Sequence, residues 1–217
     1  MKKIIIVLFL FAAFNCKAQL ANTKWKATLN INGDVATLFD FGKDTLKITA
    51  FTNGVTIENM VYAIVDSTLT LKKTEGQSDC DNDVMGKYKV SVIANALSIK
   101  LIADACDDRS SVLNNTVYTK FDWPATAKVD EAVLKQYAGI YAMDAGHKIT
   151  ITVENGRLMA DSKTNIPVKT EIFAVNESTF IFHFGEITLR FVKDATGKVS
   201  KFVVHQDGKD YDWIKSN

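Results

Sequence analysis

Alternation of apolar and polar residues is the feature that most constrains the fold of this 217-residue chain. It is clearest between Cys80 and Cys106, where apolar residues recur at every second position through residues 86–93 and 96–102. A period of two places alternate side chains on opposite faces of a strand, so one face is buried. Tight turns are predicted where Asn-Gly or Asp-Gly pairs separate other alternating runs, at Asn32-Gly33, Asn53-Gly54, Asn155-Gly156 and Asp207-Gly208. The pattern predicts an all-β protein.

A break in this pattern divides the chain into two modules. Residues 122–129 contain Pro124 and several small residues, which is typical of a linker. Residues 19–121 contain eight short runs joined by turns, which favour a closed antiparallel barrel because closure removes exposed sheet edges. Residues 130–217 form a second β-rich barrel or half-barrel, preceded by one short helix near residues 130–138 with Asp130 as its N-cap.

The first 18 residues are typical of a secretory signal peptide. A short basic start is followed by an apolar run of 11 residues, Ile4–Phe14, and Ala18 is the small residue before the expected cleavage site. The run is too short to span a membrane, which needs about 20 residues. We therefore expect a periplasmic or extracellular protein. The alternative is a lipoprotein anchored through Cys16, in which case the protein contacts a membrane.

The charge balance argues against a nucleic acid partner. Removing residues 1–18 takes away three lysines and leaves 23 basic residues against 25 acidic ones. A chain without a strong charge of one sign lacks the attraction that drives binding to nucleic acids or anionic membranes.

Removal of residues 1–18 also leaves an even pair of cysteines, Cys80 and Cys106. In an oxidising compartment such a pair is expected to form a disulfide, which here would close a loop of about 27 residues and contribute roughly 3–4 kcal/mol. Two reduced, buried cysteines remain the alternative.

Acidic residues surround both cysteines, namely Asp79, Asp81, Asp83, Asp104, Asp107 and Asp108. If the disulfide forms, these carboxylates converge and repel one another unless a cation lies among them. Calcium is the cation that clustered carboxylate oxygens would bind outside the cell. The alternative is a set of solvated loop acids, one of which pairs with Arg109. No other cofactor is expected.

Residues near both ends of the first module, Asn22-Thr23-Lys24-Trp25 and Asp104-Ala105-Cys106-Asp107-Asp108-Arg109, resemble the lipocalin-like (calycin) domains of bacteria. The resemblance implies that Trp25 closes one end of a barrel and that Arg109 packs over it. It also implies an interior able to hold a small apolar ligand. Large residues could fill the interior instead, and both outcomes stay open here. The candidate fillers are Phe39, Phe41, Phe51, Met60, Tyr62 and Tyr88.

Residues 130–214 resemble the small domain of unknown function that follows the catalytic domain in many β-lactamase-type serine hydrolases. Six segments carry the resemblance, in the order Leu134-x-x-Tyr137-x-Gly139-x-Tyr141, Ile149–Leu158, Thr179-Phe180, Leu189-Arg190-Phe191, Gly197-Lys198-Val199 and Phe202–Gly208. The resemblance implies an accessory module without assigned catalysis. The chain has no Ser-x-x-Lys, so the nucleophile and base of those hydrolases are missing.

The three histidines, His147, His183 and His205, fall on separate strands or turns without the local spacing of zinc ligands. We expect ordinary surface or core-edge residues. The sequence as a whole predicts a non-catalytic exported protein that binds a small apolar ligand or another exported protein. Two alternatives are a partner or inhibitor of a separate serine hydrolase, and an enzyme with dispersed His and Asp residues.

Overall fold

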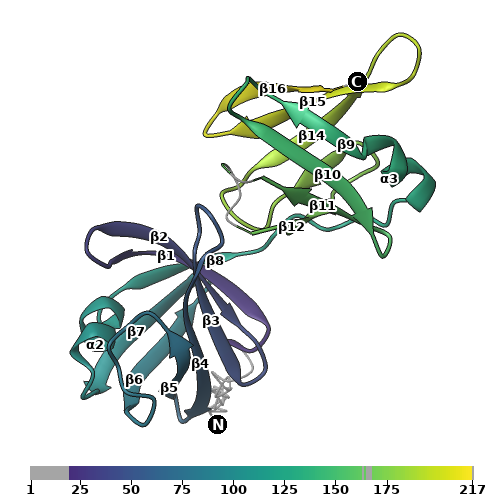
Figure 1. Cartoon of the computed structure of the whole chain (residues 1–217). Coiled ribbons are helices and arrows are strands. Elements are labelled where there is room, and N and C mark those ends of the chain that lie inside the picture. The colour runs from purple at the N-terminus through teal and green to yellow at the C-terminus, as the bar shows by residue number, and fades with distance from the viewer. Residues whose placement is uncertain (1–19, 163, 165–167, 217) are drawn as a thin grey trace, which may run out of the picture.

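The computed structural model describes residues 20–162, 164 and 168–216, so the predicted signal peptide and Cys16 lie outside the described residues. The described chain forms two closed eight-stranded antiparallel barrels in tandem, joined by a short connection (Figure 1). In each barrel every strand pairs with its neighbours in sequence, and the last strand pairs with the first. The predicted all-β, two-barrel architecture is confirmed.

The first barrel contains β1 (Thr23–Asn30), β2 (Asp34–Phe41), β3 (Thr45–Ala50), β4 (Thr56–Val65), β5 (Thr68–Gly76), β6 (Met85–Ile93), β7 (Ala96–Ala103), helix α2 (Asp107–Leu113) and β8 (Val117–Phe121). The hairpin predicted between the cysteines is β6–β7, in which Val90 pairs with Ile99. Helix α2 was not predicted from the sequence.

The second barrel follows helix α3 (Glu131–Tyr137) and contains β9 (Gly139–Ala142), β10 (Lys148–Glu154), β11 (Arg157–Asp161), β12 (Thr170–Ala174), β13 (Thr179–Ile181), β14 (Thr188–Lys193), β15 (Val199–Gln206) and β16 (Lys209–Lys215). The side chain of Asp130 accepts a hydrogen bond from the backbone N–H of Ala132 at 2.7 Å, as expected of an N-cap. Among the described residues, no helix combines the length and apolar character needed to cross a membrane.

Aromatic side chains fill the middle of both barrels. In the first barrel, the rings of Phe39 and Tyr118 meet edge to face at 4.7 Å, and both side chains are fully buried. In the second, Tyr137 of α3 stacks on Phe191 at 4.2 Å. Edge-to-face and offset stacked rings add to the stability gained from burying apolar area. Sequence alternation thus placed one face of each strand in a packed interior.

The two barrels contact each other through a group of residues that we call the seam. These residues are Lys26, Phe51, Phe121, Trp123, Phe173, His183, Gly185 and Glu186. The backbone N–H of Gly185 donates to the carbonyl of Phe51 at 2.6 Å, and Lys26 pairs with Glu186 at 3.1 Å.

Aromatic stacking continues through the seam. The ring of His183 lies 3.6 Å from that of Phe173 and 4.9 Å from that of Trp123, nearly parallel to both. Phe51, which the sequence suggested as a filler of the first barrel, instead lies in the seam, where its ring stacks on that of Trp123 at 5.7 Å. The linker residue Trp123 therefore joins the two barrels by ring contacts as well as by the backbone.

Candidate functional site

A cavity of about 470 Å³ opens at one end of the first barrel. It lies between the turn that joins β1 to β2, the first residues of β4, the loop after β5, and helix α2. Apolar side chains from these elements form much of its wall: Leu29, Ile31, Ile48, Ile57, Met60, Val112 and Leu113. Glu58, Gln77, Ser78, Asp79, Asp108 and Arg109 supply most of its polar lining. The first barrel is therefore packed through its middle and hollow at one end.

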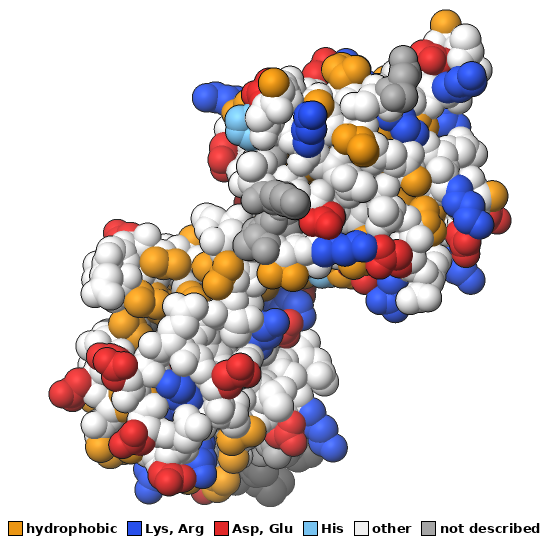
Figure 2. Space-filling view, in the orientation of Figure 1, with side chains coloured by type: hydrophobic (Ala, Val, Ile, Leu, Met, Phe, Trp, Pro, Cys, Tyr) orange, Lys and Arg blue, Asp and Glu red, His pale blue; other side chains and the backbone are white. Residues whose placement is uncertain are grey.

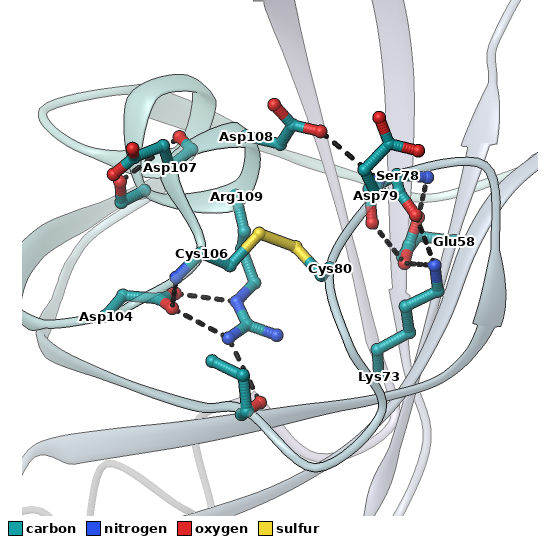
Figure 3. Close-up of a disulfide and its surroundings, with 12 residues drawn as sticks. Glu58, Lys73, Ser78, Asp79, Cys80, Asp104, Cys106, Asp107, Asp108 and Arg109 are labelled. Carbon is teal, nitrogen blue, oxygen red and sulfur yellow. Dashed lines mark hydrogen bonds and ion pairs between the residues drawn. A yellow bond between two sulfur atoms is a disulfide. The ribbon is translucent and has the colours of Figure 1, made fainter.

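Arg109 of α2 anchors the helix to the barrel through a buried ion pair. Its Nε and Nη2 donate to the two carboxylate oxygens of Asp104 at 2.6 and 2.8 Å, and Nη2 also donates to the carbonyl of Val84 at 3.2 Å (Figure 3). The two side chains are only 2% and 0% exposed. A bidentate arginine–carboxylate pair fixes orientation as well as charge.

Hydrogen bonds to Asp104 outweigh the cost of its burial. Burial opposes ionisation of this carboxyl, but the bonds from Arg109, Tyr88 and the backbone N–H of Cys106 hold its pKa below the ordinary value. Burial, together with the hydrogen bond to Asp104, raises the pKa of Tyr88. Asp104 is therefore an anion that accepts from all three groups.

The remaining nitrogen of Arg109, Nη1, is buried and has no hydrogen-bond partner within the described residues. Figure 3 shows it pointing away from Asp104. Arg109 is also one of the residues that line the cavity. A buried donor without a partner costs free energy that an incoming acceptor can recover.

A second buried ion pair lies across the cavity, on strands β4 and β5. Lys73 Nζ is 3.7 Å from Glu58 Oε1 and donates to the carbonyl of Ser78. Ser78 in turn donates to Glu58 through its hydroxyl at 2.9 Å and its backbone N–H at 3.3 Å. The pair therefore holds the loop after β5 against the barrel wall.

Two glycines make room for these buried carboxylates. A Cβ at Gly86 would meet the carboxylate of Asp104, and a Cβ at Gly76 would meet that of Glu58. Gly76 also has a φ of +151°, which side-chain-bearing residues rarely adopt. Only glycine fits these two close approaches.

The disulfide joins the loop after β5 to the N-cap of α2. Cys80 and Cys106 are bonded, with their Cα atoms 5.4 Å apart, and Figure 3 shows the bridge between the Arg109 and Glu58 clusters. The predicted disulfide is confirmed. It fixes the loop after β5 relative to α2, which are two of the segments that line the cavity.

The six acids near the cysteines do not share one environment. Asp104 pairs with Arg109, Asp108 accepts from the backbone N–H of Asp79 at 3.2 Å, and Asp83 lies 3.6 Å from Lys72 at the surface. Asp81 and Asp107 are exposed. Within the described part of the chain, no group of three or more His, Cys, Asp or Glu residues is placed to hold a metal ion. The calcium alternative stays a prediction without a geometrical basis.

Trp25 and Arg109, the pair expected to close the barrel, are both buried at 1% and 3% exposure. Trp25 lies near the beginning of β1, where its Nε1 donates to the hydroxyl of Thr23 at 2.8 Å. Arg109 lines the cavity with Leu29 and Asn30, at the end of the same strand. Their joint closing role stays a prediction.

The three histidines lie in separate surroundings. His147 Nδ1 is 2.8 Å from the Asp144 carboxylate, and His205 Nδ1 is 2.7 Å from that of Asp210. His183 is in the seam. The arrangement does not bring the three together.

Sequence reasoning missed Glu58, Lys73 and Ser78. The signal was present in the alternation, because Glu58 shares the inward face of β4 with Met60 and Tyr62. A charged residue at an inward position requires a buried partner. The site is thus a cavity whose surrounding segments are held by two buried ion pairs and a disulfide.

Residues 124–215 match a family described as Domain of unknown function (DUF3471), which covers α3 and the second barrel. The expected similarity of residues 130–214 to a domain of unknown function is thereby confirmed. No match was found among curated proteins.

Proposed function

We propose that this protein is an exported, non-catalytic binding protein whose first barrel holds a small, mainly apolar ligand. The cavity at the end of that barrel carries the proposal. Its volume of about 470 Å³ falls in the range of roughly 300–1,000 Å³ that small-molecule sites occupy.

The residues that line the cavity indicate the chemical class of its ligand. Leu29, Ile48 and Met60 form an apolar wall that favours a hydrocarbon or ring portion. Glu58, Asp108 and Arg109 supply charged groups elsewhere in the lining, where a polar group of the ligand finds partners. The ligand is thus mainly apolar and carries a polar group.

The architecture of the first barrel supports a lipocalin-like assignment. Eight strands follow one another around a closed barrel in sequence order, with Trp25 buried on the first strand. The disulfide is compatible with an exported protein, since such bonds persist in oxidising compartments. Export through residues 1–18, with release or with an anchor at Cys16, is part of this proposal.

Native mass spectrometry of the mature protein, purified from its natural host, tests the proposal. We expect an additional mass on the folded protein that disappears after extraction with organic solvent. In the variant Val112→Trp, whose new side chain occupies the cavity, that mass should be lost. Val117→Trp is the matched control, because Val117 is 66% exposed on β8 and is outside the cavity lining.

An additional mass that persists in Val112→Trp would refute the first barrel as the binding site. A protein with no additional mass in any form, and no shift in stability with extracts of its host, would refute the binding function itself.

A second candidate function is that of a partner or inhibitor of a separate serine hydrolase. The match of residues 124–215 to DUF3471 favours it, given the resemblance of this segment to accessory modules of such hydrolases. Immobilised protein should then retain a serine hydrolase from the periplasm of its host. Retention should depend on the second barrel and not on Val112.

A further inference from the structure

A second cavity, of about 310 Å³, lies at the open end of the second barrel. Side chains of β10, β15, β16 and the segment from Phe182 to Ile187 form it, together with a turn of the first barrel. Its lining consists of Thr52, Asn53, Met143, His147, Ile149, Phe182, Phe184, Ile187, Val204, Gln206, Tyr211 and Trp213. We propose that this cavity is a second binding site, and that its ligand is a small, uncharged aromatic molecule.

The floor of the cavity is part of the second barrel's core. Phe182, Ile187 and Trp213 line it while remaining only 4%, 9% and 6% exposed. Phe184 stacks on Phe182 with ring centroids 4.8 Å apart. Rings in this arrangement favour a further ring in offset or edge-to-face contact, which selects a planar aromatic ligand.

The lining also selects against charge. It contains no Lys, Arg, Asp or Glu, whereas the cavity of the first barrel contains Glu58, Asp79, Asp108 and Arg109. His147 also lines the cavity, but its Nδ1 already lies 2.8 Å from the Asp144 carboxylate. A charged ligand would lose its hydration without gaining a partner, which is costly.

Polar groups lie only at the edge of the cavity. The amide of Gln206 is available to one polar substituent on the ligand, whereas Asn53 uses its Oδ1 to accept from the backbone N–H of Val55 at 3.0 Å. The ligand is thus a ring system with at most one or two hydrogen-bonding groups.

The first barrel completes this site. Thr52 and Asn53 belong to the turn between β3 and β4, which is held in place by the hydrogen bond from Gly185 to the carbonyl of Phe51. Phe184 packs closely against the same turn, since a Cβ at Gly54 would lie 3.2 Å from its ring. The site therefore requires both barrels in contact, and it is independent of the ligand proposed for the first barrel.

Two probes with the same rings test the proposal on the full mature chain. N-phenyl-1-naphthylamine is uncharged and fluoresces in apolar surroundings, and its 8-sulfonate carries a negative charge. We expect the uncharged probe to bind at least about tenfold more tightly than the sulfonate. Equal or tighter binding of the sulfonate would overturn the assigned ligand class.

A pair of variants locates the probe. Met143→Trp fills the edge of the cavity and is expected to weaken binding of the uncharged probe by about tenfold. Ile140→Trp is the matched control, because Ile140 is on β9, is 48% exposed against 40% for Met143, and is outside the lining. Its affinity should equal that of the unchanged protein. Equal affinity in Met143→Trp would overturn the site.

The indole N–H signals of the three tryptophans give a readout that does not depend on a variant. Trp213 lines the second cavity, while Trp25 lies in the core of the first barrel. Binding of the uncharged probe should shift the Trp213 signal and leave that of Trp25 in place. A shift of Trp25 alone, or no binding at all, would overturn the proposal. Loss of the first-barrel ligand in Val112→Trp would leave these results unchanged, so the two proposals fail separately.

Discussion

The two barrels have the same strand count and the same antiparallel order, but their open ends are built from different chemistry. The first barrel carries two buried ion pairs and a disulfide around its cavity, and the second carries aromatic and aliphatic side chains around its own. A closed barrel of eight strands leaves little free space once aromatic residues fill its middle. The ends are where space remains, and there the two sequences differ most.

The difference follows from how each end is fixed. In the first barrel, the loop after β5 and helix α2 reach the cavity, and a disulfide and ion pairs hold them beside core residues such as Leu29 and Leu113. In the second barrel, the cavity floor is formed by residues of the hydrophobic core, such as Phe182 and Trp213, with no ion pair or disulfide between two of the described lining residues. The ligands proposed for the two cavities differ accordingly, because the first lining contains charged side chains and the second contains no Lys, Arg, Asp or Glu.

Charges on the visible face do not distinguish the barrels. On the face shown in Figure 2, acidic and basic side chains are interspersed over both.

The largest expected difference concerns the buried ion pair. Arg109→Leu leaves the Asp104 carboxylate buried without its cation, and we expect a loss of about 3–5 kcal/mol in the stability of the first barrel. Arg157→Leu removes an ion pair of the second barrel in which Arg157 is 65% exposed, and should cost at most about 1 kcal/mol. Hydrogen exchange measured by mass spectrometry would report each barrel separately. Similar losses of stability in the two variants would contradict the assigned difference between the open ends of the two barrels.

Removal of the disulfide should have the next largest effect. The double variant Cys80→Ser, Cys106→Ser removes the bond between two residues that are 26 positions apart in the sequence. We expect the first barrel to lose about 3 kcal/mol of stability. The second barrel has no part in this loop, so its unfolding midpoint in urea should stay unchanged. Equal destabilisation of both barrels would show that they unfold as one unit.

Much of this architecture was predictable because local signals agreed. The Asn-Gly turns, the β6–β7 hairpin and the N-cap at Asp130 each depend on residues close in sequence. The pairing of Cys80 with Cys106 followed from there being one pair in an oxidising compartment. Helix α2 was missed because its N-cap, Cys106, makes no side-chain cap, and because burial of Arg109 and Leu113 stabilises it instead.

The candidate site was less predictable because it depends on register between strands. The pairing of β4 with β5 places Met60 opposite Lys73, and a register shift between Asn59 and Met60 places Glu58 opposite Gly76. Lys73 and Glu58 approach each other through this pairing of the two strands. The prediction that Phe51 fills the first barrel was wrong for a similar reason. Whether its side chain faces its own barrel or the other depends on contacts with Trp123, which no local pattern encodes.

The smallest effect is expected at the seam, where the two barrels contact each other. Burial and the nearby Lys24 lower the pKa of His183, while Glu171 and Asp40 oppose this shift. Its Nε2 is buried without a hydrogen-bond partner among the described residues. Because its pKa is lowered in the folded seam, His183 binds fewer protons there than when the seam is open. The seam is therefore most stable above the ordinary histidine pKa of about 6.5. It weakens as the pH falls through that value toward the pKa of His183 in the folded seam. The effect is modest because His183 is only partly buried.

The amide of Gly185 reports this weakening directly, since it donates across the seam to the carbonyl of Phe51. We expect its exchange with solvent, corrected for the intrinsic pH dependence, to become faster between pH 7.5 and 5.5. In His183→Phe, a ring stays between Phe173 and Trp123 but no group titrates, so the corrected rate should be constant. If the rate of Gly185 still rose with acid in His183→Phe, the pH dependence would belong to another group, and His183 would have no part in the pH dependence of the seam.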